Sequence, residues 1–260
     1  MWLSDLPLRG VVDPLLGLAL IAGRTTRLRL GANVVPLGRN PFLLAKGLAQ
    51  LDQLSGGRLL LSFVPGLGEP GEREVLDWQG ANRGAVLEDL LATVRAWWSG
   101  QQRSDQVPSG VALDAVVRPV QDPLEVWLGG RGPKALERVG RVADGWLGAR
   151  VDPDEARAAR VAIQQSAERA GRVFDPEHFG LSIAYAREAP TDEQVLSMRT
   201  RRLDVDPLVL LPVGADALRS LLGRYLEAGL SKFVLRPAVT PPAWNHEVAW
   251  LSDTVLDMQS

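Results

Sequence analysis

The chain has 260 residues, no cysteine and a formal net charge of −2 at pH 7. This near-neutral charge gives no electrostatic reason to expect nucleic acid or an anionic membrane as a partner. The absence of cysteine excludes disulfides, thiolate nucleophiles and cysteine-based metal sites, and it fits a cytoplasmic enzyme. We expect no metal site.

The N-terminal sequence and the hydropathy give no sign of targeting to a membrane. The first ten residues, MWLSDLPLRG, lack the basic region and apolar core of a signal peptide. No apolar run reaches the roughly 18 residues that span a bilayer. A chain of this length, with 46% hydrophobic residues, is predicted to form one large domain, 1–260.

The first complete strand–helix unit lies near the N-terminus. Leucine alternates with arginine at the start of residues 28–35, which predicts a strand. Asn40 is a favourable N-cap, and Pro41 follows at the first helical position. Gly56 is a suitable helix terminator, and the continuous apolar run at 58–64 predicts a strand that is buried on both faces.

The same alternation continues to the end of the chain, which predicts a parallel sheet in a (β/α) barrel. An open dinucleotide-binding sheet is less favoured, because no Gly-x-Gly-x-x-Gly follows the first strand. The further expected strands are 124–130, 144–149, 181–186 and 232–237, and the further expected helices are 83–98, 132–143, 153–170 and 216–229.

Candidate site residues lie where the strands end, because the carboxyl ends of barrel strands carry the active site. These positions are rich in glycine and poor in acid–base side chains. The segment 129–132, GGRG, lies between a strand and a helix N-terminus, where backbone amides and the helix dipole favour a phosphate. The alternative is a tight turn with a solvated Arg131.

Several segments together resemble the luciferase-like monooxygenase superfamily, which includes bacterial luciferase and deazaflavin-dependent oxidoreductases. The resemblance covers nearly the whole chain and implies a (β/α)8 TIM barrel. The matching segments are Trp2–Asp5, Thr25–Val35, Arg39–Arg58, Arg83, Val126–Leu147 and Tyr225–Leu235.

The resemblance also implies a cofactor, either coenzyme F420 or flavin mononucleotide (FMN), at the carboxyl ends of the strands. A cis peptide at Asn33–Val34 would support the ring from behind, at a cost of about 3–4 kcal/mol. Asp5 would lie near the polar edge of the ring or the substrate and is the candidate catalytic residue; its alternative role is a helix cap. The residues that would contact the cofactor phosphate are Gly129, Gly130, Arg131 and Gly132.

The function implied is hydride transfer between F420 and a small organic substrate, with a homodimer as a possible assembly. F420 is favoured over FMN by the arginine-rich composition, which suggests a GC-rich genome. Two alternatives stay open at this point. One is an FMN-dependent monooxygenase, and the other is a barrel that binds the cofactor without turnover.

The chain departs from the family pattern in its length. It begins inside the second strand, so one βα unit of about 30 residues is expected to be missing. A start codon assigned too late is favoured over a shortened barrel as the explanation. The expectation is therefore a barrel that lacks its first βα unit, with an unpaired edge on its first and last strands.

Two further departures concern the site itself. Leu6 stands where family members commonly have histidine, and His178 and His246 are expected away from the site, so Glu69 and Glu72 are only weak substitutes. Where the family has a glycine-rich strand end, the chain reads Ser-Phe-Val-Pro-Gly at 62–66, which should change the pocket around the ring.

Overall fold

The computed structural model describes residues 1–69, 71–76, 82–100, 117–192, 195, 202 and 204–259. Within them, one sheet contains seven strands in chain order, and each strand is parallel to its neighbours. The strands are β1 (Trp2–Ser4), β2 (Leu30–Val34), β3 (Leu59–Phe63), β4 (Val126–Leu128), β5 (Gly145–Ala149), β6 (Phe179–Tyr185) and β7 (Lys232–Pro237).

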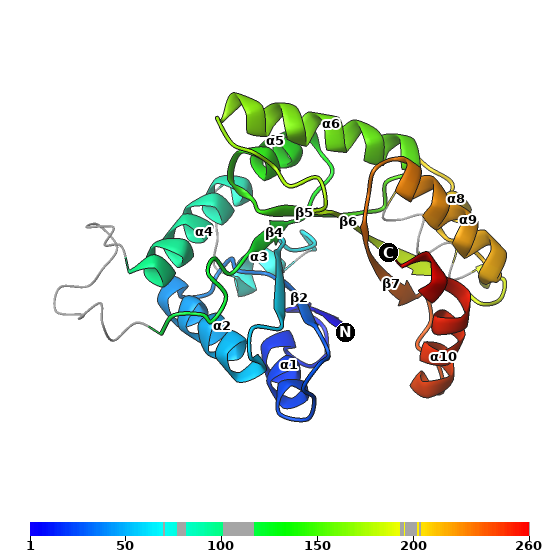
Figure 1. Ribbon diagram of the computed structural model, residues 1–260, viewed down its shortest axis with the longest axis horizontal. Helices are drawn as coiled ribbons and strands as arrows, with labels where there is room; N and C mark the ends of the chain where they lie inside the picture. Colours follow the sequence, from blue (N-terminus) through cyan, green and yellow to red (C-terminus); the bar gives the residue numbers. More distant parts are fainter. Residues whose placement is uncertain are drawn as a thin grey trace.

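Helices alternate with the strands and surround the curved sheet, which forms a nearly closed barrel (Figure 1). The expected fold class is confirmed. The helices are α1 (Pro14–Ala22), α2 (Pro41–Ser55), α3 (Glu72–Val75), α4 (Arg83–Ser99), α5 (Pro133–Val142), α6 (Pro153–Arg169), α8 (Pro207–Leu210), α9 (Gly214–Glu227) and α10 (Trp244–Val255), followed by the 3-10 turn η2 (Leu256–Met258).

Local capping chemistry explains why several helices begin and end where the sequence predicts. The Asn40 side chain accepts a hydrogen bond from the backbone of Leu43 at 3.0 Å, and Gly56 ends α2 with a φ of 66°. Asp152 and Glu155 form a reciprocal capping box at the start of α6.

Helix α1 was not expected from the sequence. All nine of its residues are apolar or glycine, so it shows no amphipathic period. Its N-terminus nevertheless has a clear local signal, because the Asp13 carboxylate accepts from the backbone of Leu15 at 2.8 Å and Pro14 occupies the first helical position.

Side chains alternate between the two faces of the sheet, as strand geometry requires. On β2, for example, Leu30, Ala32 and Val34 are fully buried in the core between the sheet and the helices. Gly31 and Asn33 therefore face the barrel interior.

Two tryptophan rings lie against glycines in the barrel interior. A Cβ atom on Gly31 would lie 2.0 Å from the Trp2 ring, and one on Gly145 would lie 2.3 Å from the Trp127 ring. The Trp127 ring also lies against Gly180. We call these five residues the floor. Gly31 thus makes room for an indole ring.

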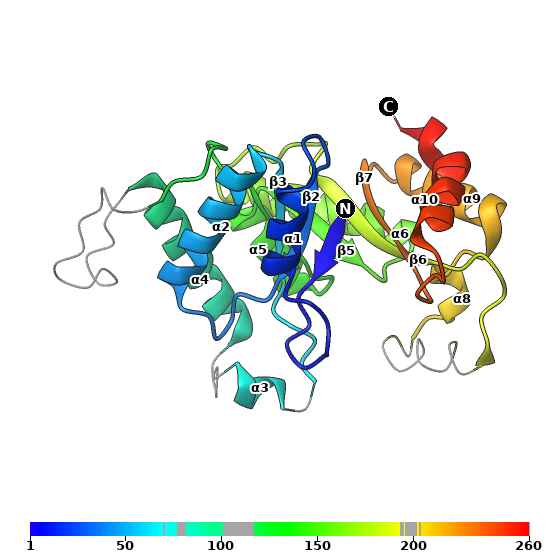
Figure 2. The same ribbon diagram turned by 90° about the horizontal axis from the view of Figure 1, so that it is seen from below.

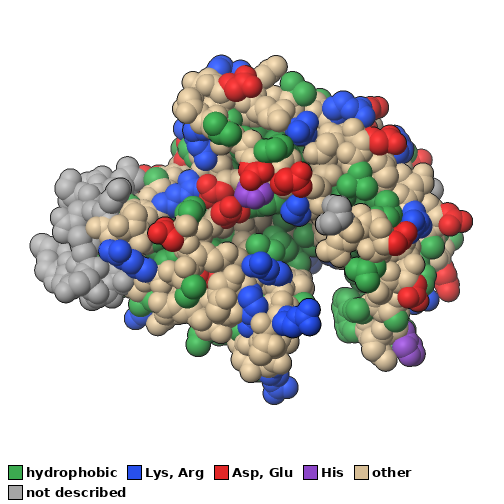
Figure 3. All heavy atoms as spheres, viewed as in Figure 1, with side chains coloured by type: hydrophobic (Ala, Val, Ile, Leu, Met, Phe, Trp, Pro, Cys, Tyr) green, Lys and Arg blue, Asp and Glu red, His purple; other side chains and the backbone are tan. Residues whose placement is uncertain are grey.

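One side of the barrel is open between its first and last strands. In the described sheet, β1 pairs with β2 alone and β7 pairs with β6 alone. Helices α1 and α10 lie on the two sides of this opening in both views of the ribbon (Figures 1 and 2). Figure 3 shows the opening as a hollow with hydrophobic side chains on its walls. Among the described helices, none has the length and apolar character needed to cross a membrane.

Candidate functional site at the carboxyl ends of the strands

The carboxyl ends of β2, β3 and β4 bring the two main candidate segments to the same rim of the barrel. Val34 pairs with Phe63, which pairs with Leu128. Beyond the strands, the Val64 amide donates to the Val34 carbonyl at 3.0 Å, and the Gly129 amide donates to the Phe63 carbonyl at 3.1 Å. We call this rim, with the inward-facing side chains just below it, the mouth.

The expected cis peptide at Asn33–Val34 is wrong. Within the described residues, the cis bond of the chain is Asp122–Pro123. The physical reason is the regular pairing of β2, which continues through Val34 without a bulge. The Asn33 carbonyl accepts from the Asp5 amide at 2.8 Å, so both neighbouring strands hold this segment in ordinary trans geometry.

Three polar side chains lie next to one another across the inner face of the mouth. Ser4, Asn33 and Ser62 are register partners on β1, β2 and β3. The Asn33 amide nitrogen donates to the Ser4 hydroxyl at 3.3 Å. Among the described residues, Asn33 Oδ1 and Ser62 Oγ are buried without a hydrogen-bond partner. Such atoms are uncommon in folded proteins and call for a water or a ligand.

Asp5 lies just beyond β1, and its carboxylate connects the ends of two strand–helix units. Asp5 Oδ2 accepts from the Val35 amide at 3.0 Å and from Arg39 at 2.8 Å. Arg39 also contacts Asp13 at 3.2 Å. Burial lowers the pKa of Arg39, but Asp5 and Asp13 outweigh this effect, so the pKa is raised. The catalytic role of Asp5 stays a prediction, beside this structural role.

The glycine corner at 129–132 is held by its neighbours but stays accessible at its tip. Gly130 has a φ of 119°, and its carbonyl accepts from Trp146 Nε1 at 2.8 Å. A Cβ on Gly132 would meet no atom within 4 Å. No side chain caps the first turn of α5, as is also true of α9 and α10, whereas side chains cap α1, α2, α4 and α6. The amides of this turn are therefore available to an anion.

Acidic groups also lie near the glycine corner. Arg202 is almost fully buried and binds Glu155 at 2.5 Å and Asp204 at 2.7 Å. The hydrogen bond from Arg202 lowers the pKa of Glu155, and the charge of Arg131 adds a smaller lowering. Arg131 itself is exposed, so it combines an accessible guanidinium with nearby negative charge.

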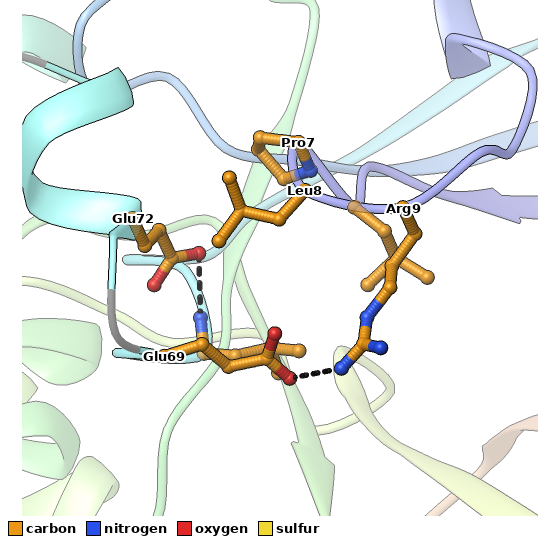
Figure 4. Close-up of a pocket in the computed structure, with 7 residues that line it drawn as sticks. Pro7, Leu8, Arg9, Glu69 and Glu72 are labelled. Carbon is orange, nitrogen blue, oxygen red and sulfur yellow. Dashed lines mark hydrogen bonds and ion pairs between the residues drawn. The ribbon is translucent and has the colours of Figure 1, made fainter.

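Two loops meet beside the mouth and enclose a small cavity (Figure 4). Arg9, from the loop after β1, forms an ion pair with Glu69, from the loop after β3, at 2.7 Å. The buried Glu72 carboxylate accepts from the amides of Leu67, at 3.1 Å, and Gly68. Leu6 lines the same cavity, so the position where the family commonly has histidine faces carboxylates that already have partners.

The two histidines lie away from the mouth. His178 directly precedes β6, so it lies at the amino end of the barrel, where its Nδ1 is 2.9 Å from the Asp144 carbonyl. It also contacts the Trp127 ring, with the ring centres 5.3 Å apart, so it is partly buried and not a simple surface residue. His246 is exposed on α10.

The residues at the mouth fit a flat cofactor with a phosphate tail. The buried polar pair, Asn33 Oδ1 and Ser62 Oγ, lacks partners, and the first turn of α5 lacks a cap. These two features lie at one rim, separated by the ends of β3 and β4. The fold is a parallel α/β barrel, and these residues make its carboxyl rim the candidate site for a small molecule.

The chain belongs to the luciferase-like monooxygenase family, whose model matches residues 2–204. A phthiodiolone/phenolphthiodiolone dimycocerosates ketoreductase from Mycobacterium tuberculosis is 34% identical over 160 residues, which are 59% of this chain and 42% of the relative. A 5,10-methylenetetrahydromethanopterin reductase from Methanolobus tindarius is 31% identical over 65% of this chain and 51% of its own length. The chain thus spans about half the length of these relatives or less.

Solved structures confirm the fold. An F420-dependent secondary alcohol dehydrogenase in complex with an F420-acetone adduct superimposes with a TM-score of 0.79 at 16% identity, and the match covers 100% of this chain and 90% of that one. The FMN complex of the oxygenating constituent of 3,6-diketocamphane monooxygenase, from a Pseudomonas putida plasmid, gives a TM-score of 0.76 at 16% identity, with 100% and 88% covered. These likenesses establish the architecture alone.

Proposed function

We propose that the chain is a one-domain oxidoreductase that transfers hydride between a bound F420 or FMN and a small organic substrate. The observation that supports this proposal most directly is made at the mouth. There the unpartnered polar atoms of Asn33 and Ser62 lie at the same rim as the uncapped N-terminus of α5. The relatives include two reductases by name, and the similar folds include both an F420 and an FMN complex. F420 is the favoured cofactor; a cytoplasmic location and a homodimer belong to the same proposal.

Two parts of the rim would bind two different parts of the cofactor. Gly129, Gly130, Gly132 and the first amides of α5 would hold the phosphate, with Arg131 adding charge. The Asn33 side chain would lie along the ring, which supplies the hydride chemistry when it is bound. Val34 would contribute only its main chain there, because its side chain is buried between the sheet and the helices. The Trp2 and Trp127 rings lie in the interior, against Gly31, Gly145 and Gly180.

A titration of the 260-residue protein with F420 and with FMN, followed by cofactor fluorescence, tests this proposal. We expect one of the two to bind, and Arg131→Ala to weaken that binding about tenfold, because a charge-assisted hydrogen bond to phosphate is lost. Added salt should weaken wild-type binding more than variant binding. The control is Arg27→Ala, which removes an exposed arginine that precedes β2 at the other end of the barrel.

Failure of both cofactors to bind the wild-type chain would exclude the proposed function. Binding of either one, without turnover of any carbonyl compound, imine or activated alkene, would favour the alternative of a non-catalytic barrel. Oxygen consumption in the presence of reduced FMN would favour the monooxygenase alternative.

A further inference from the structure

The most informative unassigned feature is the polar character of the barrel interior. Four buried side-chain atoms lack a hydrogen-bond partner among the described residues. Three of them face the interior from neighbouring strands, namely Trp2 Nε1, Asn33 Oδ1 and Ser62 Oγ. A buried polar atom without a partner is destabilising. Asn33 and Ser62 are direct register partners, so their two atoms indicate a common partner.

The chemistry of the Asn33–Ser62 pair limits what that partner is. The Asn33 amide nitrogen is directed to Ser4 Oγ at 3.3 Å, so Oδ1 is left as an acceptor. Ser62 Oγ carries a proton to donate. Strand neighbours lie about 4.8 Å apart, close enough for one ligand group to reach both side chains.

We infer that Ser62, together with Asn33, forms a subsite for a ligand group that donates one hydrogen bond and accepts another. This inference rests on the proposed function. Two groups have that chemistry: the imide edge of a flavin or deazaflavin ring, with an N–H beside a carbonyl, and the hydroxyl of an alcohol substrate. A ketone has no proton to donate and would leave Asn33 Oδ1 unpaired.

The lack of a protein partner for the Ser62 hydroxyl supports a binding role over a structural one. Ser62 is 0% exposed, yet its hydroxyl holds no other part of the described protein together. By contrast, Ser166 is buried on α6 and donates to the Glu137 carbonyl at 2.8 Å, which ties α6 to α5. The two serines are therefore a matched pair, one without a protein partner and one with a partner.

The test measures thermal stability and cofactor affinity for wild type, Ser62→Ala and Ser166→Ala. We expect Ser62→Ala to weaken ligand binding about three- to tenfold without lowering the Tm, because it removes a hydroxyl that only a ligand satisfies. We expect Ser166→Ala to lower the Tm without changing the affinity. Asn33→Ala serves as a second variant and should weaken binding at least as much as Ser62→Ala.

Two outcomes of this experiment identify the group that Ser62 and Asn33 bind. Weaker binding of F420 or FMN alone would assign the subsite to the ring edge. Unchanged cofactor binding, with loss of the spectral response of bound cofactor to propan-2-ol, would assign it to a substrate hydroxyl.

If wild type binds cofactor but Ser62→Ala changes neither property, the pair holds an ordinary buried water and the inference is wrong. If wild type binds neither cofactor, the proposed function fails first and the inference fails with it.

Discussion

The two halves of the barrel interior differ in how their space is filled. In the floor, Trp2 lies against Gly31, and Trp127 lies against Gly145 and Gly180, so large rings occupy the room that glycines leave. In the mouth, the inward side chains are small and polar, and two of their atoms have no partner in the described protein. The floor is packed for stability, whereas the mouth keeps unsatisfied groups that a ligand can use.

The largest loss of stability is expected from a substitution in the floor. Gly145→Ala would place a Cβ 2.3 Å from the rigid Trp127 ring, so we expect a loss of about 3 kcal/mol in the free energy of unfolding. Denaturant titration measures it. The control is Gly47→Ala on α2, where no atom lies within 4 Å and alanine should stabilise the helix by about 0.5–1 kcal/mol. Equal stability of the two variants would contradict the tight packing described for the floor.

An intermediate effect is expected at the boundary of the mouth. Asp5→Asn removes the charge that binds Arg39 at 2.8 Å, and we expect a loss of about 1–2 kcal/mol of stability. Arg39→Gln should cost at least as much, since it removes the ion pairs with both Asp5 and Asp13.

Turnover separates the two possible roles of Asp5. If the aspartate is catalytic, Asp5→Asn lowers kcat far more than Arg39→Gln does. If it only positions the strand ends, the two variants lose activity in proportion to their loss of stability.

The smallest effect on stability near neutral pH is expected from the two tyrosines of the chain, which help to pack the outer face of the barrel. Burial raises the pKa of Tyr185, as does its 2.6 Å hydrogen bond to Glu247, and burial raises the pKa of Tyr225. The unfolded chain ionises its tyrosines near pH 10, at about the ordinary pKa. The stabilisation is therefore complete below that pH and is lost as the pH rises toward the folded pKa values.

A spectrophotometric titration of tyrosinate checks this expectation. While the protein stays folded, neither tyrosine should ionise near pH 10, the ordinary pKa of its phenol. Both should ionise together when the protein unfolds. Ionisation of one tyrosine near pH 10 in the folded protein would contradict the packing described for it.

The sequence predicted those elements whose signals are local. Asn40 and Pro41 before α2, and Asp152 and Pro153 before α6, are capping signals that tertiary contacts do not alter. Helix α1 was not predicted because it has no polar face, although Asp13 and Pro14 form the same kind of N-terminal capping signal. Periodicity detects a helix between core and solvent, and it fails when every position is apolar.

The site was less predictable, because its features depend on neighbouring strands. The resemblance placed a cis bond at Asn33–Val34, but pairing on both sides of β2 keeps it trans. The role of Gly31 depends on Trp2, which precedes it by 29 positions in the chain. The isolation of Ser62 Oγ follows from what surrounds it in space, and no local pattern reports that.

The open side of the barrel has a consequence for motion. Among the described strands, β1 and β7 are each hydrogen-bonded to one neighbour, whereas β2 to β6 are each bonded to two. Amide protons should therefore exchange with solvent fastest in β1 and β7 and slowest toward the middle of the sheet. Local opening would then begin at the two free edges, and one of those edges belongs to the strand that carries Trp2 and Ser4.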